Sequence, residues 1–149
     1  MSVACWDGQS PVLADTSAWT ASSHAPAARE LLLTAIERGD VAWCWSVRYE
    51  LTIDARDVEG IARVDRTLDG MREIAVDRNV QRGVLATMRE LAAGGSHGAH
   101  RYPLADLTVA VAAQSAGLAV LHYDSHFDRL APLLDIQAYW IADPASTPN

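Results

Sequence analysis

The stretch "LADLTVAVAAQSAG", residues 104–117, predicts a helix whose side chains are apolar on nearly every side. Gly117 ends the run, as glycine commonly does at a helix C-terminus. A helix that is apolar all round is buried on all sides in a globular protein. The rest of the chain must therefore supply structure that covers this helix.

Asp106 is the exception in this helix, because it is the only formal charge between Arg101 and Asp124. An ionised carboxylate in a buried helix costs several kcal/mol unless another group compensates it. A simple alternative is that Asp106 complements the helix dipole from the first turn, a contribution of about 0.3–1 kcal/mol. Taken alone, Asp106 does not decide between these two interpretations.

Strand-like and helix-like segments alternate along the chain. The strand-like runs are residues 12–14, 41–45, 72–77, 119–124 and 137–143. The other helix-like stretches begin at Ser23 or Pro26 and end at Gly39, or span residues 46–56, 58–70, 80–95 and 125–132. This alternation predicts βα units around a parallel sheet that is covered on both faces. We therefore expect a three-layer α/β/α domain with a short, mainly parallel sheet of about five strands.

Length and composition limit the organisation of the chain. Its 149 residues fit one domain, and half of them are hydrophobic. We expect the domain to span residues 11–142, with a loose N-terminal extension at residues 1–10 and a tail at residues 143–149. The net charge of −7 argues against general coating of nucleic acid, although a local basic groove remains possible.

The location of the protein is predicted from what the sequence lacks. It has no run of 18 apolar residues that would span a membrane, and its first ten residues do not resemble a secretory signal. Cys5 and Cys44 are not spaced as a zinc ligand pair, and we interpret them as free thiols. The predicted location is the cytoplasm, without membrane association.

Three acidic residues follow the predicted strands and add to Asp106. Asp15 follows the strand at residues 12–14, Asp124 closes "AVLHYD", and Glu50 lies in the first turns of the helix after "VAWCW". Ligands of open α/β sheets bind beyond the carboxyl ends of the strands. We therefore expect Asp15, Glu50, Asp106 and Asp124 to meet in space.

Four converging carboxylates favour a divalent cation. Two carboxylates about 4 Å apart repel each other by roughly 4 kcal/mol at an effective dielectric constant of about 20. Oxygen ligands suit Mg²⁺ or Mn²⁺, and an open carboxylate–metal site is suited to phosphodiester hydrolysis. Ser17 is a candidate partner for a carboxylate or for a metal-bound water. A hydroxyl at a helix entry explains Ser17 equally well.

The segments that carry these acids resemble a known family. "VLADTSAWT", "SVRYELTIDAR", "HRYPLADLTVAVAA" and "VLHYDSHFDRLA" resemble the four acidic motifs of PIN-domain ribonucleases, in particular the VapC toxins of VapBC toxin–antitoxin pairs. The resemblance covers about residues 11–142. It implies that the four acids are Asp15, Glu50, Asp106 and Asp124, as catalytic residues and metal ligands, with Ser17 as the small hydroxyl. It leaves the role of Asp128 open.

The resemblance also implies an activity and partners. It implies an Mg²⁺- or Mn²⁺-dependent endoribonuclease that forms a homodimer and is held inactive by a cognate antitoxin in a hetero-oligomer. The antitoxins of this family place a peptide near the acidic site, often with an arginine among the carboxylates. Two alternatives remain: a DNA nuclease or other metal phosphohydrolase of the same fold, and an inert module that only binds a partner.

Two histidines and one further aspartate lie near Asp124 and are not among the four acids. His122 and His126 flank Asp124, and we interpret them as solvent-exposed or as substrate contacts, because neither has ligand spacing on a helix. Asp128 lies one helical turn after Asp124, beside Phe127, which we expect in the core. Its side chain should therefore point to solvent or towards Arg129.

Overall fold

The computed structural model describes residues 3–146, so residues 1–2 and 147–149 of the two predicted terminal segments lie outside the described residues. Five strands form one sheet in the order β3-β2-β1-β4-β5, and every neighbouring pair is parallel. The strands are β1 (Val12–Ala14), β2 (Val41–Cys44), β3 (Arg72–Ile74), β4 (Ala119–His122) and β5 (Ala138–Trp140). The predicted parallel sheet is confirmed.

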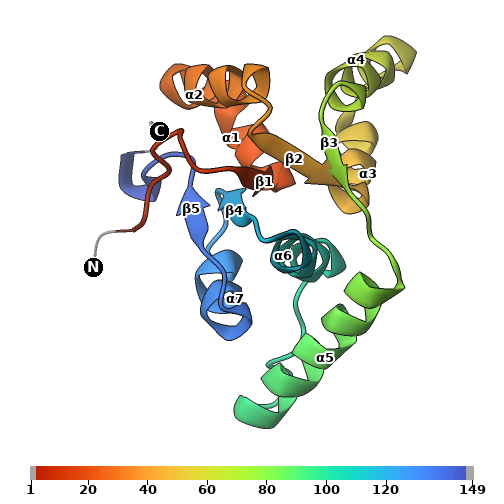
Figure 1. Ribbon diagram of the computed structural model, residues 1–149, viewed down its shortest axis with the longest axis vertical. Helices are drawn as coiled ribbons and strands as arrows, with labels where there is room; N and C mark the ends of the chain where they lie inside the picture. Colours follow the sequence, from red (N-terminus) through yellow and green to blue (C-terminus); the bar gives the residue numbers. More distant parts are fainter. Residues whose placement is uncertain (1–2, 147–149) are drawn as a thin grey trace.

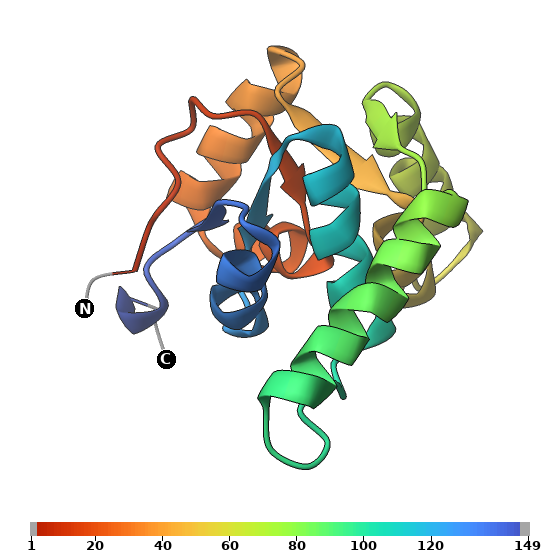
Figure 2. The same cartoon turned by 60° about the horizontal axis from the view of Figure 1, so that its bottom comes forward.

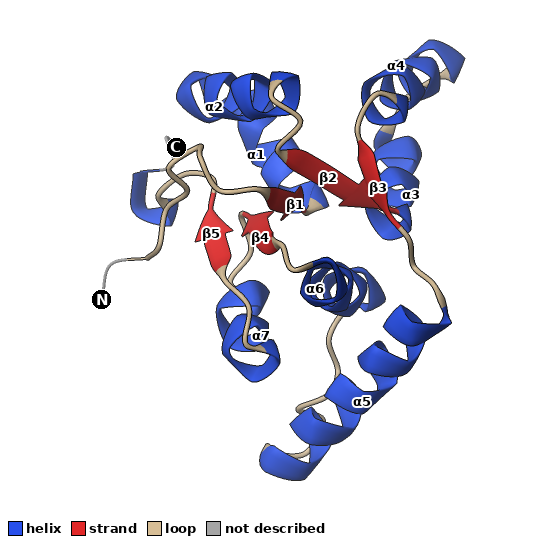
Figure 3. Ribbon diagram, in the orientation of Figure 1, coloured by secondary structure: helices blue, strands red, loops and turns tan. Residues whose placement is uncertain are grey.

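Helices cover both faces of this sheet. In the described residues they are α1 (Thr16–His24), α2 (Pro26–Glu37), α3 (Trp45–Asp54), α4 (Val58–Asp69), α5 (Arg78–Gly94), α6 (Leu104–Ala116), α7 (His126–Leu134) and the 3-10 turn η1 (Pro144–Ser146). Helices α1 and α2 lie on one side of the sheet, and α6 and α7 lie on the other (Figures 1 and 3). Helix α5 packs along the outside of α6, which Figure 2 shows from below. The three-layer α/β/α architecture is confirmed.

The side chains of the central strands alternate between two hydrophobic cores. Leu13 of β1 and Val120 of β4 belong to the core beneath α6 and α7. Val12 and Leu121, their neighbours in sequence, belong to the core beneath α1 and α2. Strand side chains alternate between faces, so this split requires apolar cover on both sides of the sheet.

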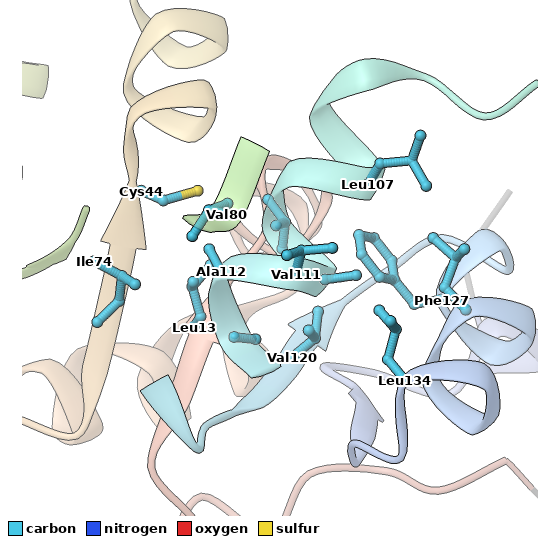
Figure 4. Packing of buried hydrophobic residues seen from close by; sticks show 14 of the residues in the cluster. Leu13, Cys44, Ile74, Val80, Leu107, Val111, Ala112, Val120, Phe127 and Leu134 are labelled. Carbon is cyan, nitrogen blue, oxygen red and sulfur yellow. The ribbon is translucent and has the colours of Figure 1, made fainter. Parts of the chain in front are cut away.

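Helix α6 is central to the first of these cores. Every residue from Asp106 to Ala113 is buried, and Val111 and Leu107 point into the same cluster as Phe127 and Val120 (Figure 4). This environment explains why the helix is apolar on nearly all sides. It also places Asp106, in its first turn, at the edge of the core.

The local boundaries differ from the predictions at several places. Residues 16–24 form helix α1, where only polar connecting residues were expected, because the carboxylate of Asp15 caps the helix by accepting from the Ser17 N–H. The predicted strand at residues 41–45 ends at Cys44, because Trp45 already begins α3. The strand expected at residues 72–77 is limited to Arg72–Ile74.

The prediction of a loose N-terminal extension is wrong for the described part of residues 1–10. The Trp6 N–H donates to the Trp140 carbonyl at 2.9 Å, and the Trp140 N–H donates to the Ala4 carbonyl at 2.9 Å. The indole of Trp6 is 4% exposed and packs in the core beneath α1 and α2. This segment therefore extends the sheet beyond β5, because backbone pairing and burial of one indole hold it in place.

None of the helices within residues 3–146 has the length and apolar character needed to cross a membrane.

Candidate active site

The four acids predicted to meet do line one cleft. Asp15 follows β1 directly, Asp124 follows β4 after one intervening residue, Glu50 lies in α3 after β2, and Asp106 lies in the first turn of α6. All four line an open cleft of about 520 Å³ at the carboxyl ends of the strands. The sheet topology thus brings together residues that are more than one hundred positions apart in sequence.

Asp15 forms the buried end of this cleft. The residue is 4% exposed, and its Oδ2 accepts from the Ser17 N–H at 3.0 Å and from the Ser17 hydroxyl at 2.6 Å. Burial raises the pKa of Asp15 from 3.8 to about 6, against the two hydrogen bonds from Ser17, and the charges of Asp106 and Glu50 add to the rise. Asp15 therefore lies where a negative charge is poorly compensated.

Ser17 connects the two strands that carry the acids. Its hydroxyl donates to Asp15 and accepts from the Tyr123 N–H at 2.9 Å. One side chain thus ties the end of β1 to the segment between β4 and Asp124. Ser17 is both the helix-entry hydroxyl and the carboxylate partner that the sequence suggested as alternatives.

Asp106 and Asp124 line the opposite wall of the cleft, and His126 contacts both carboxylates from outside the cleft lining. Nδ1 of His126 lies 2.5 Å from Oδ2 of Asp106 and 3.5 Å from Oδ1 of Asp124. Asp106 is 7% exposed, and burial raises its pKa, against a hydrogen bond from His126, while the charge of Asp124 raises it further. One ligand atom each from Asp106, Asp124 and His126 can be chosen so that all three lie within 4.8 Å of one another.

Glu50 is held by a residue that the sequence pattern did not indicate. The Thr16 hydroxyl donates to Oε1 of Glu50 at 2.8 Å, which joins α1 to α3 across the cleft. Thr16 is the residue directly after Asp15, so its proximity to the site was a usable signal. His126 gave the same signal, because it lies two residues after Asp124, but its contact with Asp106, twenty residues away, was not indicated by the sequence.

Asp128 does not line the cleft, and its side chain is 46% exposed, in agreement with the expected solvent-facing position. It also makes contacts that were not expected. Its Oδ1 accepts from Nε1 of Trp140 at 3.1 Å and lies 3.9 Å from Nε2 of His122. The turn from β4 into α7 directs Asp124 and Asp128 to different sides. Trp140 on β5 provides the nearest hydrogen-bond donor for Asp128.

The expectation that His122 is exposed or contacts substrate is wrong. Its side chain is fully buried beside the rings of Phe127 and Trp140. Burial lowers the pKa of His122 from 6.5 to about 4, against the opposing charges of Asp128 and Asp124. The strand alternation of β4 directs this side chain into the core, on the same face as Val120.

The donor set at this cleft fits a hard or borderline divalent cation. Carboxylate oxygens dominate it, and the raised pKa values of Asp15 and Asp106 show that negative charge is unfavourable there without a counter-ion. Within residues 3–146 both cysteines are free, and neither belongs to the convergent group. The chemistry therefore matches Mg²⁺ or Mn²⁺ rather than structural zinc.

A profile of the PIN domain family matches residues 12–133, which is most of the chain. The chain therefore belongs to the PIN domain family, whose four acidic motifs its sequence resembles. Ribonuclease VapC18 of Mycobacterium tuberculosis is 33% identical over 129 residues, which are 85% of this chain and 92% of that protein. Ribonuclease VapC51 of the same organism is 33% identical over 135 residues, covering 91% of this chain and 95% of that protein. The resemblance to VapC toxins is confirmed.

Solved structures share the fold. A DNA-bound VapBC complex from Salmonella typhimurium contains a chain with a TM-score of 0.72 and 16% identity, covering 90% of this chain and 100% of that one. A chain of VapBC-5 from Mycobacterium tuberculosis has a TM-score of 0.55 and 22% identity, covering 87% of this chain and 97% of that one. At these identities the likeness establishes the fold.

Proposed function

We propose that this protein is an Mg²⁺- or Mn²⁺-dependent endoribonuclease and the toxin component of a type II toxin–antitoxin pair. The observation that carries the proposal is that Asp15, Glu50, Asp106 and Asp124 line one cleft, with the pKa values of Asp15 and Asp106 raised. The relatives named ribonucleases support RNA as the substrate. The proposed catalytic residues and metal ligands are these four acids.

The chain's own residues would organise the reaction. Asp15, Glu50, Asp106 and Asp124 would hold the divalent ion, which when bound activates water and stabilises the charge that develops on the phosphate. Ser17 holds the carboxylate of Asp15, and Thr16 holds that of Glu50. The cleft is open to solvent, and the proposal places the RNA strand in it, against the carboxylates.

The first experiment measures cleavage directly. Purified protein is incubated with total RNA with and without Mg²⁺, and the cut ends are mapped. We expect cleavage in Mg²⁺ that is lost with EDTA and in the Asp106→Asn variant. Cleavage of DNA but not RNA would instead favour a DNA nuclease of the same fold, and no hydrolysis of either would favour a module that only binds a partner.

The second experiment measures metal binding through stability. A ligand that binds only the native state stabilises it, by about 1.4 kcal/mol when its concentration is ten times the Kd. Millimolar Mn²⁺ should raise the Tm of the wild type by a few degrees, since about 1 kcal/mol corresponds to roughly 2–4 °C for a domain of this size. The rise should be much smaller in Asp15→Asn. Equal rises in both proteins would exclude Asp15 as a ligand.

The proposed inhibitor is a cognate antitoxin that binds this protein in the cytoplasm. The support is that the structural neighbours described above are components of VapBC toxin–antitoxin complexes. An arginine from the antitoxin would satisfy the carboxylates with bidentate hydrogen bonds. Strong expression of the soluble protein alone should arrest growth, and co-expression of the antitoxin should restore it. Normal growth without antitoxin would contradict a toxin role.

We also propose that the protein is a homodimer, and an exposed apolar face supports this. Trp45 and Tyr49 of α3, Leu85 of α5 and Leu104 of α6 are each more than half exposed and border a groove of about 740 Å³. Large apolar patches on a protein surface mark interaction sites, and homodimer interfaces are the more apolar class. The double variant Trp45→Glu with Leu104→Glu should be monomeric by light scattering. A dimer that persists in this variant would place the interface elsewhere.

A further inference from the structure

The imidazole of His126 contacts two of the carboxylates that line the cleft, from the side of a neighbouring pocket that His126 itself lines. His126 Nδ1 is 2.5 Å from Asp106 Oδ2 and 3.5 Å from Asp124 Oδ1. Among the residues that the structure describes, Asp106, Asp124 and His126 form the group whose ligand atoms converge within 4.8 Å. The position of His126 is therefore comparable to that of the acids themselves.

One contact fixes the backbone of His126, and another packs against its ring. The backbone N–H of His126 donates to Oδ1 of Asp124 at 3.0 Å, at the point where α7 begins. The ring of Tyr102, just before α6, packs against the imidazole at 5.3 Å in an edge-to-face arrangement. The side chain is 41% exposed, so an ion arriving from solvent can reach it. The imidazole is thus positioned by the fold and still accessible.

We propose that His126 is a ligand of the divalent ion, together with Asp106 and Asp124, and that it makes the site prefer borderline transition-metal ions over Mg²⁺. This inference rests on the proposed function, because it concerns the metal of the same cleft. Mg²⁺ binds through oxygen ligands and releases its water reluctantly. Imidazole nitrogen suits first-row transition metals, whose affinity for nitrogen sites rises from Mn²⁺ to Co²⁺ and beyond.

The test uses Co²⁺ and Mg²⁺ as probes of the full-length protein by titration calorimetry. His126→Asn removes the nitrogen ligand, and His126→Asp makes the donor set entirely carboxylate. Both residues suit the first turn of a helix, and circular dichroism verifies the fold. His24→Ala is the matched control, because His24 lines the cleft with the four acids and lies outside the convergent group.

We expect His126→Asn to weaken Co²⁺ binding at least about tenfold while Mg²⁺ binding changes less than about threefold. In His126→Asp the ratio of Co²⁺ to Mg²⁺ affinity should also fall at least about tenfold. The visible absorption of bound Co²⁺ should shift in both variants and not in His24→Ala.

The outcomes separate this inference from the proposed function. If the wild type binds both ions and the affinity ratio and the Co²⁺ spectrum are unchanged in both His126 variants, His126 is not a ligand and only this inference fails. If the wild type binds neither ion at millimolar concentration, the proposed metal-dependent function fails as well. A change in the His24→Ala control equal to that in His126→Asn would also overturn the assignment.

Discussion

Two histidine–aspartate pairs lie on opposite sides of Asp124 and have opposite environments. On the cleft side, His126 contacts Asp106 at 2.5 Å and remains 41% exposed. On the core side, His122 lies 3.9 Å from Asp128 and is fully buried. Both pairs combine the same residue types within a few positions of one acid.

The difference arises from backbone geometry. His122 is the last residue of β4, and the alternation of the strand directs its ring onto Phe127 and Trp140. His126 is the first residue of α7, and its ring faces the start of α6. An imidazole beside a carboxylate is therefore no evidence of a functional site by itself. Access to solvent and convergence with further acids distinguish the cleft side.

The largest expected effect is a loss of activity, and it should differ between Asp124 on the cleft side and Asp128 on the core side. Asp124→Asn should lower kcat/KM for RNA by at least about 100-fold, a loss of about 2.7 kcal/mol, because it removes a carboxylate from the cleft. Asp128→Asn should lower it less than about tenfold, because Asp128 bonds to Trp140 outside the cleft. The measurement is a single-turnover cleavage assay on variants shown to be folded. A greater loss in Asp128→Asn would reverse the assignment of the two sides.

The next effect is the pH dependence of the free energy of unfolding, measured in EDTA so that no metal is bound. It depends on one buried titrating group on each side, Asp15 and His122. Folding raises the pKa of Asp15 to about 6, so between pH 4 and 6 the native state binds more protons and stability falls as the pH rises. Folding lowers the pKa of His122 to about 4, so between pH 4 and 6.5 the unfolded state binds more protons and stability rises with pH. Each pKa shift changes the free energy of unfolding by about 3 kcal/mol over its whole pH interval.

These opposite slopes partly cancel in the wild type and should separate in variants. The free energy of unfolding of Asp15→Asn should rise between pH 4 and 6.5, whereas that of His122→Leu should fall over the same interval. Asp106, whose pKa is also raised, is retained in both variants. Urea unfolding at four pH values measures the slopes. Identical slopes in the two variants would show that these two residues do not titrate as described.

A smaller effect is expected from Ser17→Ala. The hydroxyl of Ser17 lowers the pKa of Asp15 and holds the Tyr123 N–H, so its loss should raise the Asp15 pKa further and loosen the carboxylate. We expect a loss of activity of about tenfold, typical of residues that orient metal ligands. Ser23→Ala is the control, because the Ser23 hydroxyl bonds only to the Thr20 carbonyl in the same helix. Equal activity of the two variants would remove Ser17 from the site.

The smallest effect tests the core side. Asp128→Ala removes the acceptor of the Trp140 indole N–H and an acidic side chain from the first turn of α7. Each contributes about 0.5–1 kcal/mol at a partly exposed position, so together they should lower the Tm by about 2–8 °C. Asp128→Asn keeps an acceptor oxygen and should lose less. A Tm of Asp128→Ala equal to that of the wild type would show that the indole bond contributes no stability.

The parallel sheet and the placing of the four acids at one cleft were predictable because they depend on patterns along the chain, whereas the order of the strands was not predicted. Short apolar runs separated by helices imply a parallel sheet, and parallel strands carry Asp15 and Asp124 to the same edge. The buried helix at residues 104–117 was recognisable from composition alone. These features depend on hydrophobic burial, which each segment shows independently.

Other features depend on contacts between distant residues and were therefore missed. Helix α1 is made of small and polar residues, and it forms where Asp15 caps it and α2 packs against it. The contact of the His126 imidazole with Asp106 forms only where the start of α6 meets the start of α7. The role of Trp6 depends on β5, at the other end of the chain. No local pattern contains this information.

The pairing of the N-terminal segment with β5 has a consequence for synthesis of the chain. Trp6 leaves the ribosome early, but the backbone groups of Trp140 to which it bonds are made about 130 residues later. Because chains are synthesised at about 5–20 residues per second, the indole of Trp6 stays unpacked for on the order of ten seconds before β5 is made. During that time the first apolar side chain of the core is available to chaperones, and β5 completes the sheet only after nearly the whole domain has been translated.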